Sequence, residues 1–189
     1  MVQNSGDIIL LMGLPVDTKD PNLGLGGSSY LQVKHKCKNG NPPRCDLQHE
    51  KKIQMALLDF IRAGWIKSAH DCSDGGLMCA VAECCFSQDI ALNTPKLKGA
   101  EIDLTSCEYD RVDALLFGET QGRIILTANK TDIQKLINKA AELSIPLNII
   151  GKVSSSDLYS PTLSVKTKNA FFSWNVSELY SIWWNTVEN

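Results

Sequence analysis

The sequence predicts a layered α/β or α+β domain in which helices pack on a mixed β-sheet. Strand-like apolar runs alternate along the chain with segments whose apolar residues recur at helical spacing. The length of 189 residues suits one domain, and 43% hydrophobic with 21% charged residues is ordinary for a chain that buries its own core. Because no repeat or internal linker is evident, we expect residues 1–189 to form a single domain.

The first third of the chain contains two expected strands and a long loop. Residues 7–13 form a continuous apolar run that ends at glycine, which is typical of a buried strand. Residues 15–27 are rich in Asp, Asn and Gly, so we expect a surface loop. The alternation in residues 28–34 predicts a short strand.

Two helices are expected next. Asp46 is a plausible cap for the first helix, which should end at Gly64. Its apolar residues recur at helical spacing: Ile53, Leu57, Phe60 and Ile61. Residues 65–69 should return toward the sheet, and a polar turn then leads into a second helix over residues 77–86.

The second half of the chain alternates in the same way. Thr131 is expected to cap a third helix, which the segment 144–146 ends, and residues 176–187 should form a last helix that carries Leu179, Ile182 and Trp183. The expected strands are residues 100–104, 114–117, 122–128, 147–153 and 162–166.

Charge and hydropathy exclude several classes of protein. Nineteen Lys and Arg residues against twenty-one Asp and Glu residues leave a net charge of −2, with no basic run to neutralise a phosphate backbone or an anionic membrane. No apolar stretch is long enough to span a bilayer, and the first residues lack the features of a secretory signal. We therefore expect a cytoplasmic protein with neither a nucleic acid nor a membrane as partner.

The number and spacing of the cysteines indicate free thiols. Their number, seven, is odd, and no two have the C-x-x-C spacing that zinc sites and dithiol redox centres prefer. A reducing compartment is the simpler interpretation than a disulfide framework or a metal site.

The first candidate site is the segment 68–77, which lies between an expected strand end and a helix start. Gly75 and Gly76 would let a phosphate approach the backbone beside Ser73, at the positive end of a helix dipole. Asp71 could hold a magnesium ion that bridges to that phosphate. The alternative is structural: Ser73 or Asp74 caps the helix and the glycines make a tight turn.

The second candidate is the segment 25–30. Gly26, Gly27 and Ser28 could form a nest of N–H groups that holds an anion. The segment does not fit the dinucleotide pattern G-x-G-x-x-G, because Ser29 stands where the third glycine should be and the following residues look like a strand. Taken alone, the segment is better explained as a flexible loop that leads into a strand.

The third candidate is the segment 116–123, between two expected strands. Glu119, Thr120 and Gln121 offer polar groups, and Arg123 offers a fork that suits a carboxylate or a phosphate. A plain hairpin turn with a charged tip is the alternative.

No nucleophile with an adjacent base is evident. The chain has only three histidines, and none accompanies a glycine-flanked serine or a plausible nucleophilic cysteine. We assign no catalytic residue and expect a binding part that lacks a catalytic part.

Taken together and in this order, LGGSSY (25–30), AHDCSDGGL (69–77) and LFGETQGR (116–123) resemble the C-terminal domain of the aminoimidazole ribonucleotide synthase-like family of ATP-dependent enzymes. The similarity extends from Gly6 to about Trp183 and is strongest to the phosphoribosylformylglycinamidine synthases of purine biosynthesis. It implies an α/β layered fold, partly ferredoxin-like, and a part in making formylglycinamidine ribonucleotide from formylglycinamide ribonucleotide, ATP and glutamine-derived ammonia.

The resemblance also implies cofactors, partners and site residues. ATP or ADP and magnesium would be the cofactors. By analogy with the first copy of this module in the family, Asp71 would be the metal ligand and Glu119, Thr120 and Gln121 the part that faces a ribonucleotide, here at the pseudo-symmetric second site, which in some relatives holds a structural nucleotide. The partners would be the remaining domains of a longer synthetase chain, a glutamine amidotransferase subunit or domain, and a small-molecule ribonucleotide. Because the family's catalytic histidine lies in other domains, we expect this chain to be a fragment that is inactive alone.

Two positions depart from the family pattern, and two alternatives stay open. Thr120 replaces the usual serine but keeps the hydroxyl, whereas Ser29 replaces a glutamate and removes a carboxylate. Within the superfamily, the alternatives are a selenophosphate synthase, thiamine monophosphate kinase or hydrogenase maturation type. In another class, the chain would be an assembly module whose Trp174, Trp183 and Trp184 dock a partner, although these residues could equally belong to the core.

Overall fold

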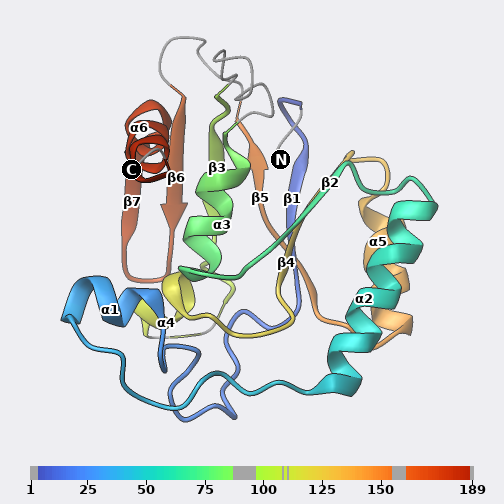
Figure 1. Ribbon diagram of the computed structural model, residues 1–189. Helices are drawn as coiled ribbons and strands as arrows, with labels where there is room; N and C mark the ends of the chain where they lie inside the picture. The colour runs from blue at the N-terminus through green and yellow to red at the C-terminus, as the bar shows by residue number, and fades with distance from the viewer. Residues whose placement is uncertain (1–3, 87–96, 108, 110, 155–160, 188–189) are drawn as a thin grey trace.

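The computed structural model describes residues 4–86, 97–107, 109, 111–154 and 161–187. Its centre is a seven-stranded mixed sheet with the order β2-β4-β1-β5-β3-β6-β7 (Figure 1). Neighbouring strands are antiparallel, except that β3 and β6 run parallel. The strands are β1 (Ile8–Met12), β2 (Ser68–Asp71), β3 (Ala100–Asp103), β4 (Ile124–Ala128), β5 (Leu147–Val153), β6 (Thr162–Lys166) and β7 (Phe171–Asn175).

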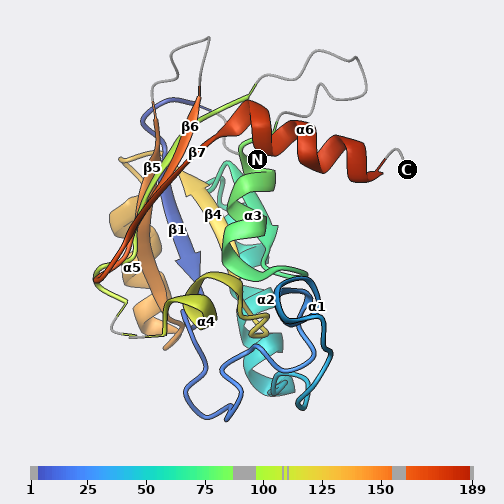
Figure 2. The same cartoon turned by 90° about the vertical axis from the view of Figure 1, so that its left-hand side faces the viewer.

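Helices cover both faces of the sheet, so the predicted layered architecture is confirmed (Figures 1 and 2). Helices α2 and α5 pack on one face, and α3, α4 and α6 pack on the other. The helices are α1 (Ser29–His35), α2 (Leu47–Arg62), α3 (Gly76–Cys84), α4 (Val112–Phe117), α5 (Ile133–Glu142) and α6 (Val176–Val187). Among the described residues, no helix has the length and apolar content that crossing a bilayer requires.

Strand β1 separates the two halves of the core. Ile9 and Leu11 join the cluster under α3, whereas Leu10 and Met12 join the cluster under α2 and α5. A strand that is buried on both faces needs apolar side chains at every position, because successive side chains point to opposite faces. The continuous apolar run that predicted this strand therefore has its explanation in the two-sided packing.

The predicted start and end of α2 are confirmed. The Asp46 carboxylate accepts hydrogen bonds from the amides of Gln48 and His49, at 3.0 and 3.1 Å. Because Gly64 adopts a positive φ of 67° just beyond the helix, it ends α2 in the way that glycine commonly ends helices.

The segment 28–34 is a helix, so its prediction as a strand is wrong. Ser28 caps α1, since its hydroxyl accepts a hydrogen bond from the Leu31 amide at 3.3 Å. No residue of α1 is buried, so the helix has no apolar face that could have produced a helical pattern in the sequence.

Two further expectations are corrected, and one strand is found that the sequence did not predict. Residues 114–117 belong to α4 and not to a strand, because a short apolar run suits a buried helical turn as well as a strand. Asp132, and not Thr131, occupies the cap position of α5. Strand β7 was not anticipated at all.

The tail tryptophans belong largely to the core. Trp174 and Trp183 are partly buried against the cluster under α3, and Trp184 lies against Tyr180 with ring centroids 6.1 Å apart. The core interpretation is therefore the better supported one for Trp174 and Trp183.

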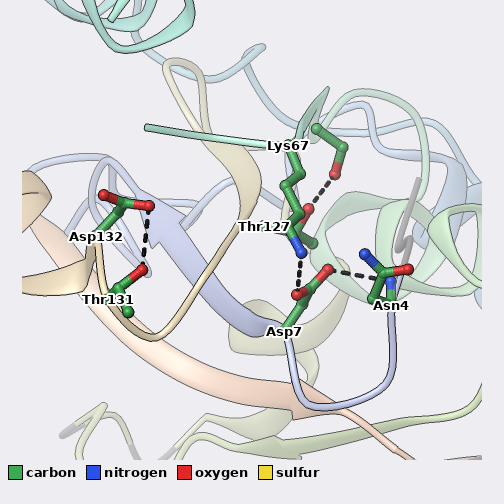
Figure 3. A network of polar contacts seen from close by, with 7 residues as sticks. Asn4, Asp7, Lys67, Thr127, Thr131 and Asp132 are labelled. Carbon is green, nitrogen blue, oxygen red and sulfur yellow. Dashed lines mark hydrogen bonds and ion pairs between the residues drawn. The ribbon is translucent and has the colours of Figure 1, made fainter. Parts of the chain in front are cut away.

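A polar network joins the start of β1 to the segment that enters β2 (Figure 3). The Lys67 ammonium donates to the Asp7 carboxylate at 2.5 Å, and the Asn4 amide donates to the other oxygen of Asp7 at 3.0 Å. The hydroxyls of Ser68 and Thr127 lie 2.6 Å apart across β2 and β4. These polar contacts therefore hold the segment that enters β2 against the start of β1, and they join β2 to β4. Strand β2 then leads toward the candidate site.

Candidate functional site

The three sequence segments meet around Glu119. One oxygen of its carboxylate, Oε1, accepts a hydrogen bond from the Ser29 amide and another from the Gly75 amide, each at 2.9 Å. These partners lie 90 and 44 residues away in the sequence. In Figures 1 and 2, α1, α4 and the N-terminal end of α3 accordingly lie together below the sheet.

Two of the predicted glycines allow the segments to approach closely. Gly76 has a φ of 69°, and a Cβ atom there would lie 2.5 Å from the Gly118 carbonyl oxygen. A Cβ atom at Gly26 would lie 1.9 Å from the carbonyl oxygen of Asn41. Both residues must be glycine for the backbones to pack as they do.

Several of the predicted phosphate-binding amides already have acceptors within the protein. The Gly75 amide donates to Glu119, and the Gly76 amide donates to the carbonyl oxygen of Ser73 at 3.1 Å. The amides of Gly27 and Ser28 donate to the carbonyl oxygens of Asn39 and Leu25, at 2.9 and 3.1 Å. These four amides thus hold the loops together in the described chain.

The structural alternative for the segment 68–77 is half right: Gly75 and Gly76 make a tight turn with positive φ angles of 76° and 69°, but neither Ser73 nor Asp74 caps the helix. Gly75 occupies the cap position of α3, and no side chain makes a capping hydrogen bond there. Ser73 instead donates its hydroxyl proton to the carboxylate of Asp71. The polar residues of this turn therefore remain on the side of the turn that borders the cavity.

A cavity of about 390 Å³ opens beside this turn. Four carboxylates and a single guanidinium border it, so its surface is electronegative. Such a surface repels a bare phosphate and accommodates one that arrives with a divalent cation. The lining residues are Glu50, Gln54, Asp71, Cys72, Ser73, Asp74, Glu119, Gln121, Gly122, Arg123 and Ile124.

Asp71 suits the metal-binding role that was predicted for it. It ends β2 with an exposed carboxylate, and the hydrogen bond from the Ser73 hydroxyl lowers the pKa of that carboxyl below its ordinary value. Within the described ranges, no group of three or more His, Cys, Asp or Glu residues could form a complete metal site. Magnesium would take one carboxylate from the chain and its remaining oxygens from phosphate and water, which is a common arrangement for this ion.

Arg123 is a structural residue, which corrects its interpretation as a phosphate fork. Its side chain is only 2% exposed and donates to the carbonyl oxygens of Thr120 at 3.2 Å, Pro15 at 3.0 Å and Gly118. Burial lowers the pKa of the guanidinium. The charge of Arg123 thus holds the loop 118–123 in shape, and its donors are taken up by backbone carbonyl oxygens.

The residues around Glu119 differ in accessibility. Thr120 is buried, and its hydroxyl has no hydrogen-bond partner among the described residues. Gln121 is exposed at the cavity, and its side-chain amide donates to the Glu119 carbonyl oxygen at 3.5 Å. Only Glu119 and Gln121 of the predicted substrate-facing segment line the cavity.

Sequence reasoning missed two residues of the cavity wall, Glu50 and Gln54. They lie four residues apart on α2, and therefore on one face of the helix. Helical periodicity could have paired them with each other, but nothing in the sequence places that face beside the loop 118–123. His70, by contrast, faces Glu83 at 3.1 Å and does not line the cavity.

Comparison with known proteins gives the family. Residues 4–163 match the family described as AIR synthase related protein, C-terminal domain. The phosphoribosylformylglycinamidine synthase subunit PurL of Prochlorococcus marinus (strain MIT 9313) is 40% identical over 161 residues, which are 80% of this chain and 19% of that protein. PurL of Synechococcus elongatus (strain ATCC 33912 / PCC 7942 / FACHB-805) is 31% identical over 188 residues, which are 98% of this chain and 23% of that protein.

Solved structures share the fold. T. maritima PurL complexed with FGAR superposes with a TM-score of 0.71 and 19% sequence identity, over 94% of this chain and 28% of that one. The hydrogenase maturation protein HypE of E. coli is more distant, with a TM-score of 0.57 and 13% identity over 93% of this chain and 50% of that one. The chain spans about a fifth of the length of the PurL relatives. It belongs to the family of AIR synthase related C-terminal domains, and within that family it is similar to the PurL subunits of phosphoribosylformylglycinamidine synthase.

Proposed function

We propose that the chain is a single C-terminal domain of a PurL-type synthetase and forms one wall of its nucleotide-binding cleft. The observation that carries the proposal is the cavity beside Asp71, around which the three family segments converge. Support comes from the relatives, since T. maritima PurL has been solved in complexes with ATP, ADP and AMPPCP as well as with FGAR.

The proposed reaction is that of an ATP-dependent ligase. ATP would phosphorylate the amide oxygen of formylglycinamide ribonucleotide, and ammonia released from glutamine would displace the phosphate to give formylglycinamidine ribonucleotide, ADP and phosphate. Magnesium neutralises phosphate charge when it is bound. In this chain, Asp71 would hold the metal, Ser73 would orient Asp71 through their hydrogen bond, and Gln121 would contact the ligand from the cavity wall.

The proposal requires other parts. The remaining domains of the synthetase chain would supply the catalytic residues and further ATP contacts, and a glutamine amidotransferase subunit or domain would supply ammonia. One related structure is described as PurLQS from T. maritima, which is consistent with an assembly of several subunits. We place the reaction in the cytoplasm.

Calorimetry with magnesium-ADP tests the nucleotide site directly. We expect the wild-type chain to release or absorb heat on binding, and Asp71→Asn to abolish the signal because it removes the anionic metal ligand. Glu142→Gln is a matched control, since Glu142 lies on α5 outside the cavity and pairs with Lys139 on the helix surface. Equal binding by Asp71→Asn and the wild type would remove Asp71 from the site, and no heat from the wild type would contradict the nucleotide site itself.

A turnover assay tests the division of labour. With formylglycinamide ribonucleotide, ATP and ammonia, we expect the isolated chain to release no ADP above background, because its described residues provide no catalytic group. Turnover that is traceable to this chain would contradict the proposal that other domains carry the chemistry.

A further inference from the structure

Glu119 is the common acceptor of two distant backbone amides, although it stands in a segment that the family resemblance assigns to a ligand. Its Oε1 atom receives the amides of Ser29 and Gly75, which open α1 and α3 respectively. A carboxylate in this position meets the partial positive charge of both helix starts, which strengthens each hydrogen bond.

The loop that carries Glu119 is itself firmly held. The Glu119 amide donates to the Gly24 carbonyl oxygen at 2.7 Å, and Arg123 holds the carbonyl oxygens of the residues on either side, Gly118 and Thr120. The carboxylate therefore extends from a rigid backbone, and its two bonds transmit that rigidity to the segments 25–30 and 73–76.

The second of these segments carries part of the cavity wall. Ser73 lies two residues before Gly75, and its hydroxyl fixes the carboxylate of Asp71. Movement of the Gly75 amide would therefore displace the groups that are proposed to hold the metal.

We infer that Glu119 is a positioning residue, which ties the 25–30 and 73–76 segments together through its two amide bonds and so sets the geometry around Asp71. The inference rests on the proposed nucleotide site. It differs from a direct role because the charge of Glu119 acts on the backbone and not on the ligand.

A proline substitution separates the two roles. Ser29 is the first residue of α1 and its amide bonds to Glu119, so Ser29→Pro removes one of the two bonds, and the proline ring displaces the carboxylate from position 29 without removing its charge. Proline suits the first position of a helix, and the extended conformation of Ser28 suits the residue before a proline. Leu47→Pro is the matched control, since Leu47 is the exposed first residue of α2 and Asp46 bonds to the amides of Gln48 and His49 instead.

Magnesium-ADP affinity in the 189-residue chain gives the functional result. Glu119→Ala should weaken binding about tenfold or more, as the loss of a residue that orients a metal ligand commonly does. Glu119→Gln should retain most of the affinity, because an amide oxygen still accepts both bonds. Ser29→Pro should weaken binding, whereas Leu47→Pro should not. The effect of Ser29→Pro on affinity should be smaller in the Glu119→Ala background than in the wild-type chain.

Two results would overturn the inference. If Glu119→Gln binds as weakly as Glu119→Ala while Ser29→Pro binds normally, Glu119 acts through its charge on the ligand. If thermal melts show lower stability but affinity is unchanged in all variants, Glu119 is only structural.

Amide hydrogen exchange tests the tie without any ligand. Glu119→Ala should speed exchange at both Ser29 and Gly75, and Ser29→Pro should speed exchange at Gly75. Unchanged exchange at these amides would refute the coupling of the two segments through Glu119. If the exchange data show this coupling but the wild-type chain binds no magnesium-ADP, the nucleotide site is refuted and, with it, the expected effect on affinity.

Discussion

Arg123 is a buried cation whose hydrogen bonds go to backbone carbonyl oxygens, and this sets the cost of replacing it. Arg123→Met keeps an unbranched side chain of similar length but leaves the carbonyl oxygens of Thr120, Pro15 and Gly118 without their donor. Because hydrogen bonds to charged groups contribute about 1.5–3 kcal/mol each and solvent or relaxation recovers part of the loss, we expect destabilisation by about 3 kcal/mol. Urea unfolding measures this free energy.

The control is Arg62→Met. The Arg62 side chain is 74% exposed on α2, so its replacement should change the free energy of unfolding by less than about 0.5 kcal/mol. Similar losses for the two variants would mean that the carbonyl contacts of Arg123 add nothing to stability.

Asp71 and Ser73 give a prediction on pH. The Ser73 hydrogen bond is the main reason that the pKa of Asp71 lies below its ordinary value, so Ser73→Ala should raise this pKa toward that value. The sign follows from linkage: a lowered pKa in the folded state stabilises the protein above the ordinary pKa, and the contribution is lost as the pH falls through the lowered pKa. A titration of the Asp71 carboxyl carbon by NMR measures both values.

The same titration bears on metal binding. Since Asp71 stays ionised at every pH well above about 4, we expect its contribution to magnesium-ADP affinity to be flat from weakly acidic to neutral pH. A pKa of Asp71 that is the same with and without the Ser73 hydroxyl would contradict the assigned cause.

At the scale of the elements, the sequence predicted those whose packing leaves a repeating signal. Strand β1 is buried on both faces and α2 on one, so each shows its burial in the order of its residues. Helix α1 buries no residue, and it is held by the Ser28 cap, by Glu119 and by Tyr30, which stacks on Phe117 with ring centroids 5.1 Å apart. Such tertiary contacts leave no local pattern, which is why this helix was mistaken for a strand.

The contact between β1 and the entry to β2 depends on the pair of Asp7 and Lys67 (Figure 3). Asp7→Asn keeps the shape of the side chain but removes the anion beside an ammonium whose side chain is only 19% exposed. Because breaking a fully buried pair costs about 3–5 kcal/mol and this one is partly solvated, we expect a loss of about 2 kcal/mol in urea unfolding.

Glu101→Gln provides the comparison for that variant. Glu101 pairs with Lys152 at 3.1 Å, but both side chains are more than half exposed. Exposed pairs contribute about 1 kcal/mol at most, so Glu101→Gln should be clearly milder than Asp7→Asn. If the two variants lose equal stability, burial of the Asp7 pair is not what makes it matter.

Across the fold, the three segments of the site could be predicted from the sequence, but the bonding of their amides and the negative charge of the cavity could not. The segments that contain Gly26, Gly75 and Glu119 were all identified from the sequence, and the structure brings them together. Amides that looked available for a phosphate are instead bonded within the chain, and Glu50 reaches the cavity from a distant helix. Both facts depend on which loops meet, and that is decided by the packing of the sheet and its two helical layers.

The distribution of thiols between surface and core gives a prediction for the whole fold. All seven cysteines are free; Cys45 is exposed, whereas burial raises the pKa of Cys72 to about 12 and that of Cys84 to about 11. Only the thiolate reacts with iodoacetamide, and a thiol of pKa 11 is about 0.1% ionised at pH 8. We therefore expect iodoacetamide to label Cys45 in the folded chain and to label Cys84 only when the core opens. Site-resolved mass spectrometry after timed labelling measures both rates. Arg123→Met should speed labelling of Cys84 in proportion to its loss of stability and leave the rate at Cys45 unchanged. If Cys84 reacts as fast as Cys45 in the folded chain, the core around α3 is open to solvent.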